Sequence, residues 1–133
     1  MQIYFALFLF SGVLGWGIDA FYRSAIDKKW VSGTKIPGFS PTYACGAMIL
    51  LFLVPILSPL FWMYKLIGYA IILSALEFMS GLFCVYIMKK KFWNYSKNFM
   101  NLNGHTDILH AFYWGILGIA FELLLYPIFD NLI

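Results

Sequence analysis

Long stretches without charge dominate this sequence and predict helices that cross a membrane. Residues 1–18 contain no charged side chain, and three further apolar stretches follow along the chain. Each stretch comes close to the ~20 residues that an α-helix needs to cross a hydrocarbon core of ~30 Å. We therefore predict an all-α integral membrane protein, a bundle of about four transmembrane helices in a single domain. The predicted spans are approximately residues 2–20, 41–62, 66–88 and 106–129 of the 133 residues.

Local signals refine the first three spans. The first lacks the basic start and the small-residue exit site of a cleaved signal peptide, so we interpret it as a membrane helix. Pro55 and Pro59 fall in the second half of the second span and predict a kink or early unwinding there. Only Tyr64 and Lys65 separate the second span from the third. These two spans are therefore expected to form a tight helical hairpin.

The composition excludes a soluble globular domain. Hydrophobic residues make up 62% of the chain and charged residues only 11%, whereas soluble domains carry about a quarter charged residues. The net charge of +3 does not indicate nucleic-acid binding, because the basic residues form short clusters beside apolar stretches. Lipid headgroups are the expected counterions. Cys45 and Cys84 are too few for a disulfide scaffold or a zinc site, and we interpret them as packing thiols.

The distribution of lysine and arginine predicts the orientation. Eight of these nine residues lie in the connections 21–40 and 89–105, and Lys65 alone lies on the other side. The positive-inside rule then places both connections in the cytoplasm and both termini on the opposite side of the membrane. The eight residues are Arg23, Lys28, Lys29, Lys35, Lys89, Lys90, Lys91 and Lys97.

Glu77 is the most informative polar residue. Eleven uncharged residues flank it on each side, so it is expected near the middle of the third span. A carboxylate at the centre of a bilayer costs roughly 2.5–3.5 kcal/mol on insertion scales and normally faces other helices, where it finds a partner or a proton. Glu77 is therefore a candidate functional residue.

Further polar residues are expected at the cytoplasmic end of the bundle. Asp19 and Arg23 lie one helical turn apart in the first span, and Asp107 and His110 begin the fourth. Together with Glu77 they form a predicted intramembrane polar cluster that could relay a proton or a cation. The alternative is that these residues only hydrogen-bond to one another and hold the helices in register. A metal site is not predicted, because no two histidines are four residues apart.

No catalytic motif is present, and the chain lacks the Gly-x-x-x-x-Gly-Lys-Ser/Thr loop with which proteins bind ATP phosphates. An enzymatic role is thus not indicated, no cofactor is predicted, and the chain cannot hydrolyse ATP by itself. The second and fourth helices start beside the lysine clusters, which would suit the phosphate of an anionic lipid.

Short motifs along nearly the whole chain resemble one family. They are Phe10-Ser11, Gly15-Trp16 with Asp19, Pro41-x-Tyr43-x-x-Gly46, Leu76-Glu77 with Gly81, Phe92-Trp93-Asn94-Tyr95-Ser96, Met100-Asn101-x-x-Gly104, Trp114-Gly115 and Pro127. The chain resembles the bacterial family of putative ABC transporter type IV (CmpB-like) permeases. The resemblance implies a transport role without naming a substrate. The family-motif positions are Trp16, Pro41, Tyr43, Gly46, Trp93, Asn94, Tyr95, Ser96, Asn101 and Gly104.

Three functions follow as hypotheses. The first is a small transport component that acts as a homo-oligomer or with a separate ATPase subunit, because four helices enclose little pathway alone. The second is a membrane-embedded binder or enzyme for a phosphorylated lipid, with lysines that hold the phosphate. The third is an accessory or assembly protein whose polar residues only recruit partner helices.

Overall fold

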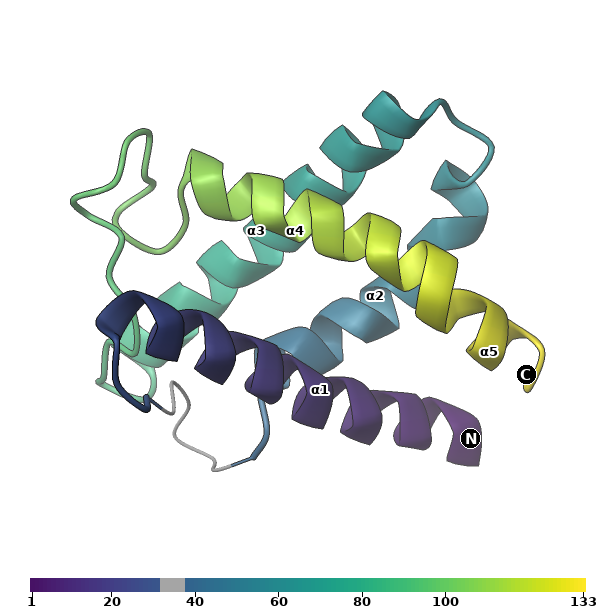
Figure 1. Cartoon of the computed structure of the whole chain (residues 1–133), viewed down its shortest axis with the longest axis horizontal. Helices are drawn as coiled ribbons and strands as arrows, with labels where there is room; N and C mark the ends of the chain where they lie inside the picture. Colours follow the sequence, from purple (N-terminus) through teal and green to yellow (C-terminus); the bar gives the residue numbers. More distant parts are fainter. Residues whose placement is uncertain (32–37) are drawn as a thin grey trace. The chain divides into compact units, whose positions relative to one another are not determined.

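The structure is a computed structural model that describes residues 1–31 and 38–133, and over these residues the chain is helical, as predicted (Figure 1). Helix α1 comprises Gln2–Asp27, α2 comprises Pro41–Leu57 and α3 comprises Trp62–Tyr86. The last helical stretch is continuous and consists of α4 (Ile108–Ala120), the π-helical segment η1 (Phe121–Leu125) and α5 (Tyr126–Asp130). Lys35, which contributed to the predicted orientation, lies outside the described residues.

Three of these helical stretches are long and apolar enough to cross a membrane, namely Gln2–Asp27, Trp62–Tyr86 and Ile108–Asp130. They also expose large apolar side chains that water would not favour. Phe5, Ile71 and Leu124 are 63%, 64% and 67% exposed. These properties fit a membrane protein. The bundle arrangement, the location of the termini and the orientation stay predictions.

The helix bounds differ from the predicted spans at two places. Helix α1 continues past residue 20 to Asp27, where Lys28 takes up a left-handed conformation with φ 53° and ends the helix. Helix α2 is 17 residues long and ends at Leu57, and α3 begins at Trp62. The turn therefore precedes Tyr64 and Lys65, which lie in the first turn of α3. Pro59 explains the earlier turn, because it lacks a backbone N–H to continue α2.

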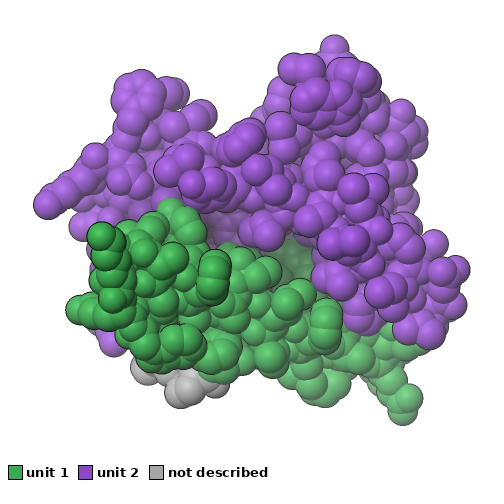
Figure 2. Space-filling view, in the orientation of Figure 1, with its two compact units in different colours: residues 1–48 green, residues 49–133 purple. Residues whose placement is uncertain are grey.

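The chain divides into two compact units, residues 1–48 and 49–133 (Figure 2). In the first unit, α1 packs against the beginning of α2 and the residue before it, Ser40. A Cβ atom on Gly15 would lie 2.1 Å from Cβ of Tyr43, so only glycine allows this close approach. The backbone N–H of Ser40 donates to the carbonyl oxygen of Gly12 at 2.9 Å. Asp19 and Arg23 form an ion pair of 2.9 Å on α1.

In the second unit, α4 packs along α3 (Figure 1). Gly118 of α4 faces Tyr69 of α3, and a Cβ atom on Gly118 would lie 2.5 Å from that of Tyr69. One turn after Gly118, Glu122 connects the two helices. It accepts hydrogen bonds from Lys65 and from the Tyr69 hydroxyl, both at 2.6 Å. Glu122 lies in η1, and π-helical turns are uncommon and recur at functional sites.

The close contact at Gly15 generates a first prediction. Gly15→Ala should lower the free energy of unfolding by about 1–3 kcal/mol, because the new methyl group would overlap Tyr43. The matched control is Gly17→Ala on the same helix, where a Cβ atom meets nothing within 4 Å. It should change stability by no more than about 1 kcal/mol and in the stabilising direction. Thermal unfolding of both variants in detergent micelles tests this, and equal melting temperatures would contradict the packing.

The pair formed by Lys65 and Glu122 generates a second prediction. Their side chains are only 16% and 10% exposed, so Glu122→Leu leaves a largely buried ammonium group without its partner. We expect a loss of about 3 kcal/mol in unfolding free energy. The double variant Lys65→Met, Glu122→Leu should recover most of that loss, because no unpaired charge remains. Unfolding in mixed micelles with increasing SDS measures both values, and additive losses would argue against the pair.

Candidate functional site

The connection between α3 and α4, residues 87–107, has a defined fold in which asparagine side chains hold the backbone. Asn101 donates from its side-chain nitrogen to the carbonyl oxygens of Ser96 and Asn98, at 3.2 and 2.9 Å. Its side-chain oxygen accepts the backbone N–H of Gly104 at 3.0 Å. The side-chain oxygen of Asn94 accepts the backbone N–H of Ser96 at 3.0 Å, which forms a tight turn.

Gly104 is required by this turn for two reasons. Its φ of 73° lies in the left-handed region, where residues with a Cβ atom are strained. A Cβ atom would also lie 2.6 Å from the side-chain oxygen of Asn94. The carbonyl oxygen of Gly104 accepts the backbone N–H of Tyr95 at 2.9 Å, so the two arms of the connection are joined.

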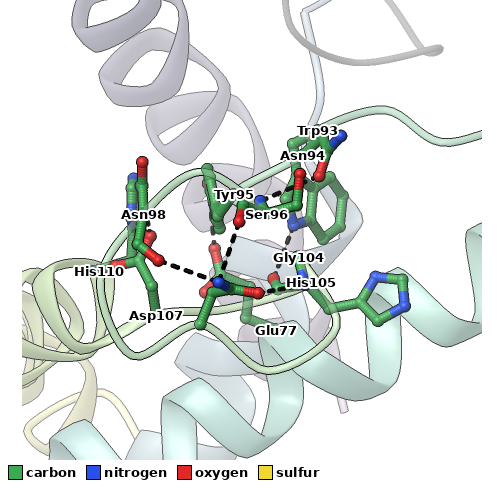
Figure 3. Close-up of polar contacts among 11 residues, drawn as sticks. Glu77, Trp93, Asn94, Tyr95, Ser96, Asn98, Gly104, His105, Asp107 and His110 are labelled. Carbon is green, nitrogen blue, oxygen red and sulfur yellow. Dashed lines mark hydrogen bonds and ion pairs between the residues drawn. The ribbon is translucent and has the colours of Figure 1, made fainter.

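Two aromatic residues of this connection, Trp93 and Tyr95, contact the residues before α4, α4 itself and α3 (Figure 3). The indole N–H of Trp93 donates to the carbonyl oxygen of His105 at 2.7 Å. The Tyr95 hydroxyl donates to Oε1 of Glu77 at 3.4 Å, a long hydrogen bond. The Tyr95 ring stacks on the imidazole of His110 with centroids 3.9 Å apart and an angle of 13° between planes. Tyr95 thus connects α3 with the beginning of α4.

Asp107 joins the connection to α4 as the N-cap of that helix. Its Oδ1 accepts the backbone N–H of His110 at 2.8 Å. Its Oδ2 accepts a hydrogen bond from the Asn98 side chain at 2.6 Å and lies 2.8 Å from Nδ1 of His110. Burial alone would raise the pKa of Asp107, but the hydrogen bonds from His110 and Asn98 outweigh it and lower that pKa. The carboxylate therefore stays charged and holds the helix start.

Glu77 lies beneath these residues on α3 and is only 6% exposed. Besides Tyr95, its neighbours include Thr106 and Trp114. His105 packs on the same helix, against Phe78 and over Gly81. The result is a buried carboxylate enclosed by an ordered connection and by the first turns of α4, all within the second unit. We refer to Glu77, Tyr95, Asn98, Thr106, Asp107 and His110 as the Glu77 site.

Comparison with known proteins gives one result. A family model described as "Putative ABC-transporter type IV" matches residues 6–133. The chain belongs to this family. The match covers nearly the whole chain, so the resemblance predicted from the short motifs is confirmed. No curated protein and no solved structure shows significant similarity to this chain.

The family-motif positions fall in both units. Trp93, Asn94, Tyr95, Ser96, Asn101 and Gly104 build the connection around Glu77, where Asn94, Asn101 and Gly104 shape the backbone and Tyr95 contacts the carboxylate. In the first unit, Tyr43 lies against Gly15, the ring of Trp16 meets that of Trp30 edge-on, Gly46 is buried and Pro41 begins α2.

The predicted polar cluster divides in the same way. Within the second unit, Glu77, Asp107 and His110 lie together. Within the first unit, Asp19 and Arg23 form an ion pair. A shared role for these residues stays a prediction. Sequence reasoning missed Asn98 and Thr106 as members of the site, and it did not pair Lys65 with Glu122. The one sequence signal for this end of the site was an aspartate, Asp107, directly before the fourth apolar helix, a position typical of a helix N-cap.

His105 provides a third prediction, on pH dependence. Burial lowers the pKa of this imidazole, and the nearby Lys91 lowers it further. The folded state disfavours the charged form of His105. With respect to this residue, the folded state is therefore most stable above the ordinary pKa of about 6.5. That stability is lost as the pH falls through the lowered pKa.

We expect backbone amides of residues 93–106 to exchange hydrogen faster, relative to His105→Gln, as the pH falls below about 6.5. Hydrogen exchange with mass spectrometry measures this, after correction for the intrinsic pH dependence of exchange. The control is His110→Gln, which retains His105 and should retain the effect. The same pH profile in wild type and His105→Gln would contradict the prediction.

Proposed function

We propose that this protein is a membrane-embedded subunit of a transporter in the bacterial plasma membrane, acting with a separate ATPase subunit or as an oligomer. Membership of the ABC-transporter type IV family and three helices of membrane-spanning length support this. The sequence has no phosphate-binding loop for ATP. Hydrolysis would therefore come from another chain.

The observation that carries the proposal is the enclosure of the Glu77 carboxylate. It sits within an apolar helix of 25 residues and is held by the same connection that contains the most specific family motifs. A carboxylate in such a place is costly, and in membrane proteins the carboxylates that are kept there mark ion pathways. Glu77 would be the working group of the subunit.

The connection would also link Glu77 to the surface. It begins with the exposed residues Lys89, Lys90 and Lys91, and it ends at Asp107 on α4. Under the predicted orientation it faces the cytoplasm, where an ATPase subunit would bind. A partner that moves the connection would act on Tyr95 and, through its hydroxyl, on Glu77.

The three consecutive exposed lysines favour one alternative, a binder or enzyme for a phosphorylated lipid. Each lysine near an anionic membrane surface contributes about 1 kcal/mol of attraction. Under this alternative the lysines would hold the headgroup phosphate, and His110 would do the proton chemistry. The same experiment separates the two functions.

Native mass spectrometry of the protein released from mild detergent tests the proposal. We expect a complex with an ATPase subunit, with vanadate-sensitive ATP hydrolysis, or a defined homo-oligomer. A variant with Lys89, Lys90 and Lys91 changed to alanine serves as a control for lipid binding. A monomer that carries one anionic lipid, and loses the lipid in this variant, would overturn the proposal in favour of the alternative.

A further inference from the structure

Two buried oxygen atoms at the Glu77 site lack hydrogen bonds. Among the described residues, Oε2 of Glu77 and Oγ1 of Thr106 have no hydrogen-bond partner. The two residues are only 6% and 4% exposed. Thr106 approaches the Glu77 carboxylate without meeting hydrogen-bond geometry. Buried polar atoms are rarely left without partners, so each such atom requires an explanation.

The basic side chain that faces the Glu77 carboxylate is the His110 imidazole, which is itself held by Asp107. Two stronger bases pair with other carboxylates, Arg23 with Asp19 and Lys65 with Glu122. The other polar side chains beside the carboxylate are neutral: Tyr95 offers a long hydrogen bond to Oε1, and the Trp114 indole lies close to it. A buried carboxylate surrounded in this way is stabilised by binding a cation.

The donor atoms indicate the class of cation. Carboxylate and hydroxyl oxygens are hard ligands that suit Na⁺ and a proton rather than soft transition metals. Ser74 supports this, because it lies one turn before Glu77 on α3 and its buried hydroxyl also lacks a partner among the described residues. The titratable groups that face the carboxylate are Asp107, His110 and Tyr95.

We propose that Oε2 of Glu77 and Oγ1 of Thr106 bind a small monovalent cation, either Na⁺ or a proton. A cation between them satisfies both atoms at once and neutralises a charge that the apolar helix cannot stabilise. This inference rests on the proposed function, because it names the class of ion on which the transport subunit acts.

Chemical modification of the full-length protein in detergent micelles tests the site. Dicyclohexylcarbodiimide is an apolar reagent that attacks protonated carboxyl groups inside membrane proteins, and peptide mass spectrometry locates the product. Choline chloride replaces NaCl at constant ionic strength. If the ion is Na⁺, modification of Glu77 should slow about tenfold when Na⁺ reaches ten times its Kd. Glu122 serves as the negative control: a carboxylate paired with a lysine lacks the proton that the reagent needs, so Glu122 should stay unmodified with and without Na⁺.

Thr106 provides the matched variants. Thr106→Val keeps the shape of the side chain but removes Oγ1, and it should abolish the protection, whereas Thr106→Ser should retain it. If the ion is a proton, modification of Glu77 should decline with rising pH, ignore Na⁺ and change its pH profile in Thr106→Val. A rate that responds to neither Na⁺ nor pH, or an unchanged response in Thr106→Val, would overturn the site.

The two proposals can fail separately. A complex with an ATPase subunit but no cation effect at Glu77 would leave the transport assembly standing and remove the cation site. A monomer without ATPase whose Glu77 is still protected by Na⁺ would remove the transport assembly and leave the cation site standing.

Discussion

The second unit depends on the need to enclose a carboxylate inside an apolar helix. Glu77 could face lipid only at a cost of several kcal/mol, so the chain must supply cover for it. The connection that follows α3 provides that cover by folding back with Tyr95 and Thr106 beside the carboxylate. Asp107 then starts α4 at the right place, because its side chain caps the helix and holds His110. The residues that enclose Glu77 thus also determine where α4 begins beside α3.

Packing in the rest of the chain follows from small residues. In lipid there is little hydrophobic force between helices, so van der Waals contact and hydrogen bonds must hold them together. Gly15 and Gly118 allow tyrosine side chains to approach a helix backbone closely. Tyr69 then reaches Glu122 with its hydroxyl and closes the far part of the α3–α4 contact with Lys65.

The sequence was sufficient for the features that depend on local pattern. Charge-free stretches predicted the helices, and isolation among apolar residues singled out Glu77. The turn before α3 was misplaced, because the charge at Lys65 was taken as the end of a span. In the structure Pro59 ends α2, and Lys65 forms an ion pair with Glu122, 57 residues away. The fold of residues 87–107 was equally out of reach. Its asparagines act on backbone groups, and no hydrophobic period records such contacts.

The asparagines also determine how this connection responds to its surroundings. Amide side chains bonded to backbone carbonyl and N–H groups carry no net charge, so dissolved ions do not screen them. The turn around Asn101 and Gly104 should therefore keep its shape from dilute to concentrated salt. The attraction of Lys89, Lys90 and Lys91 for an anionic surface weakens over the same range. Ionic strength can thus loosen what this connection touches outside the membrane while the turn around Asn101 and Gly104 keeps its shape.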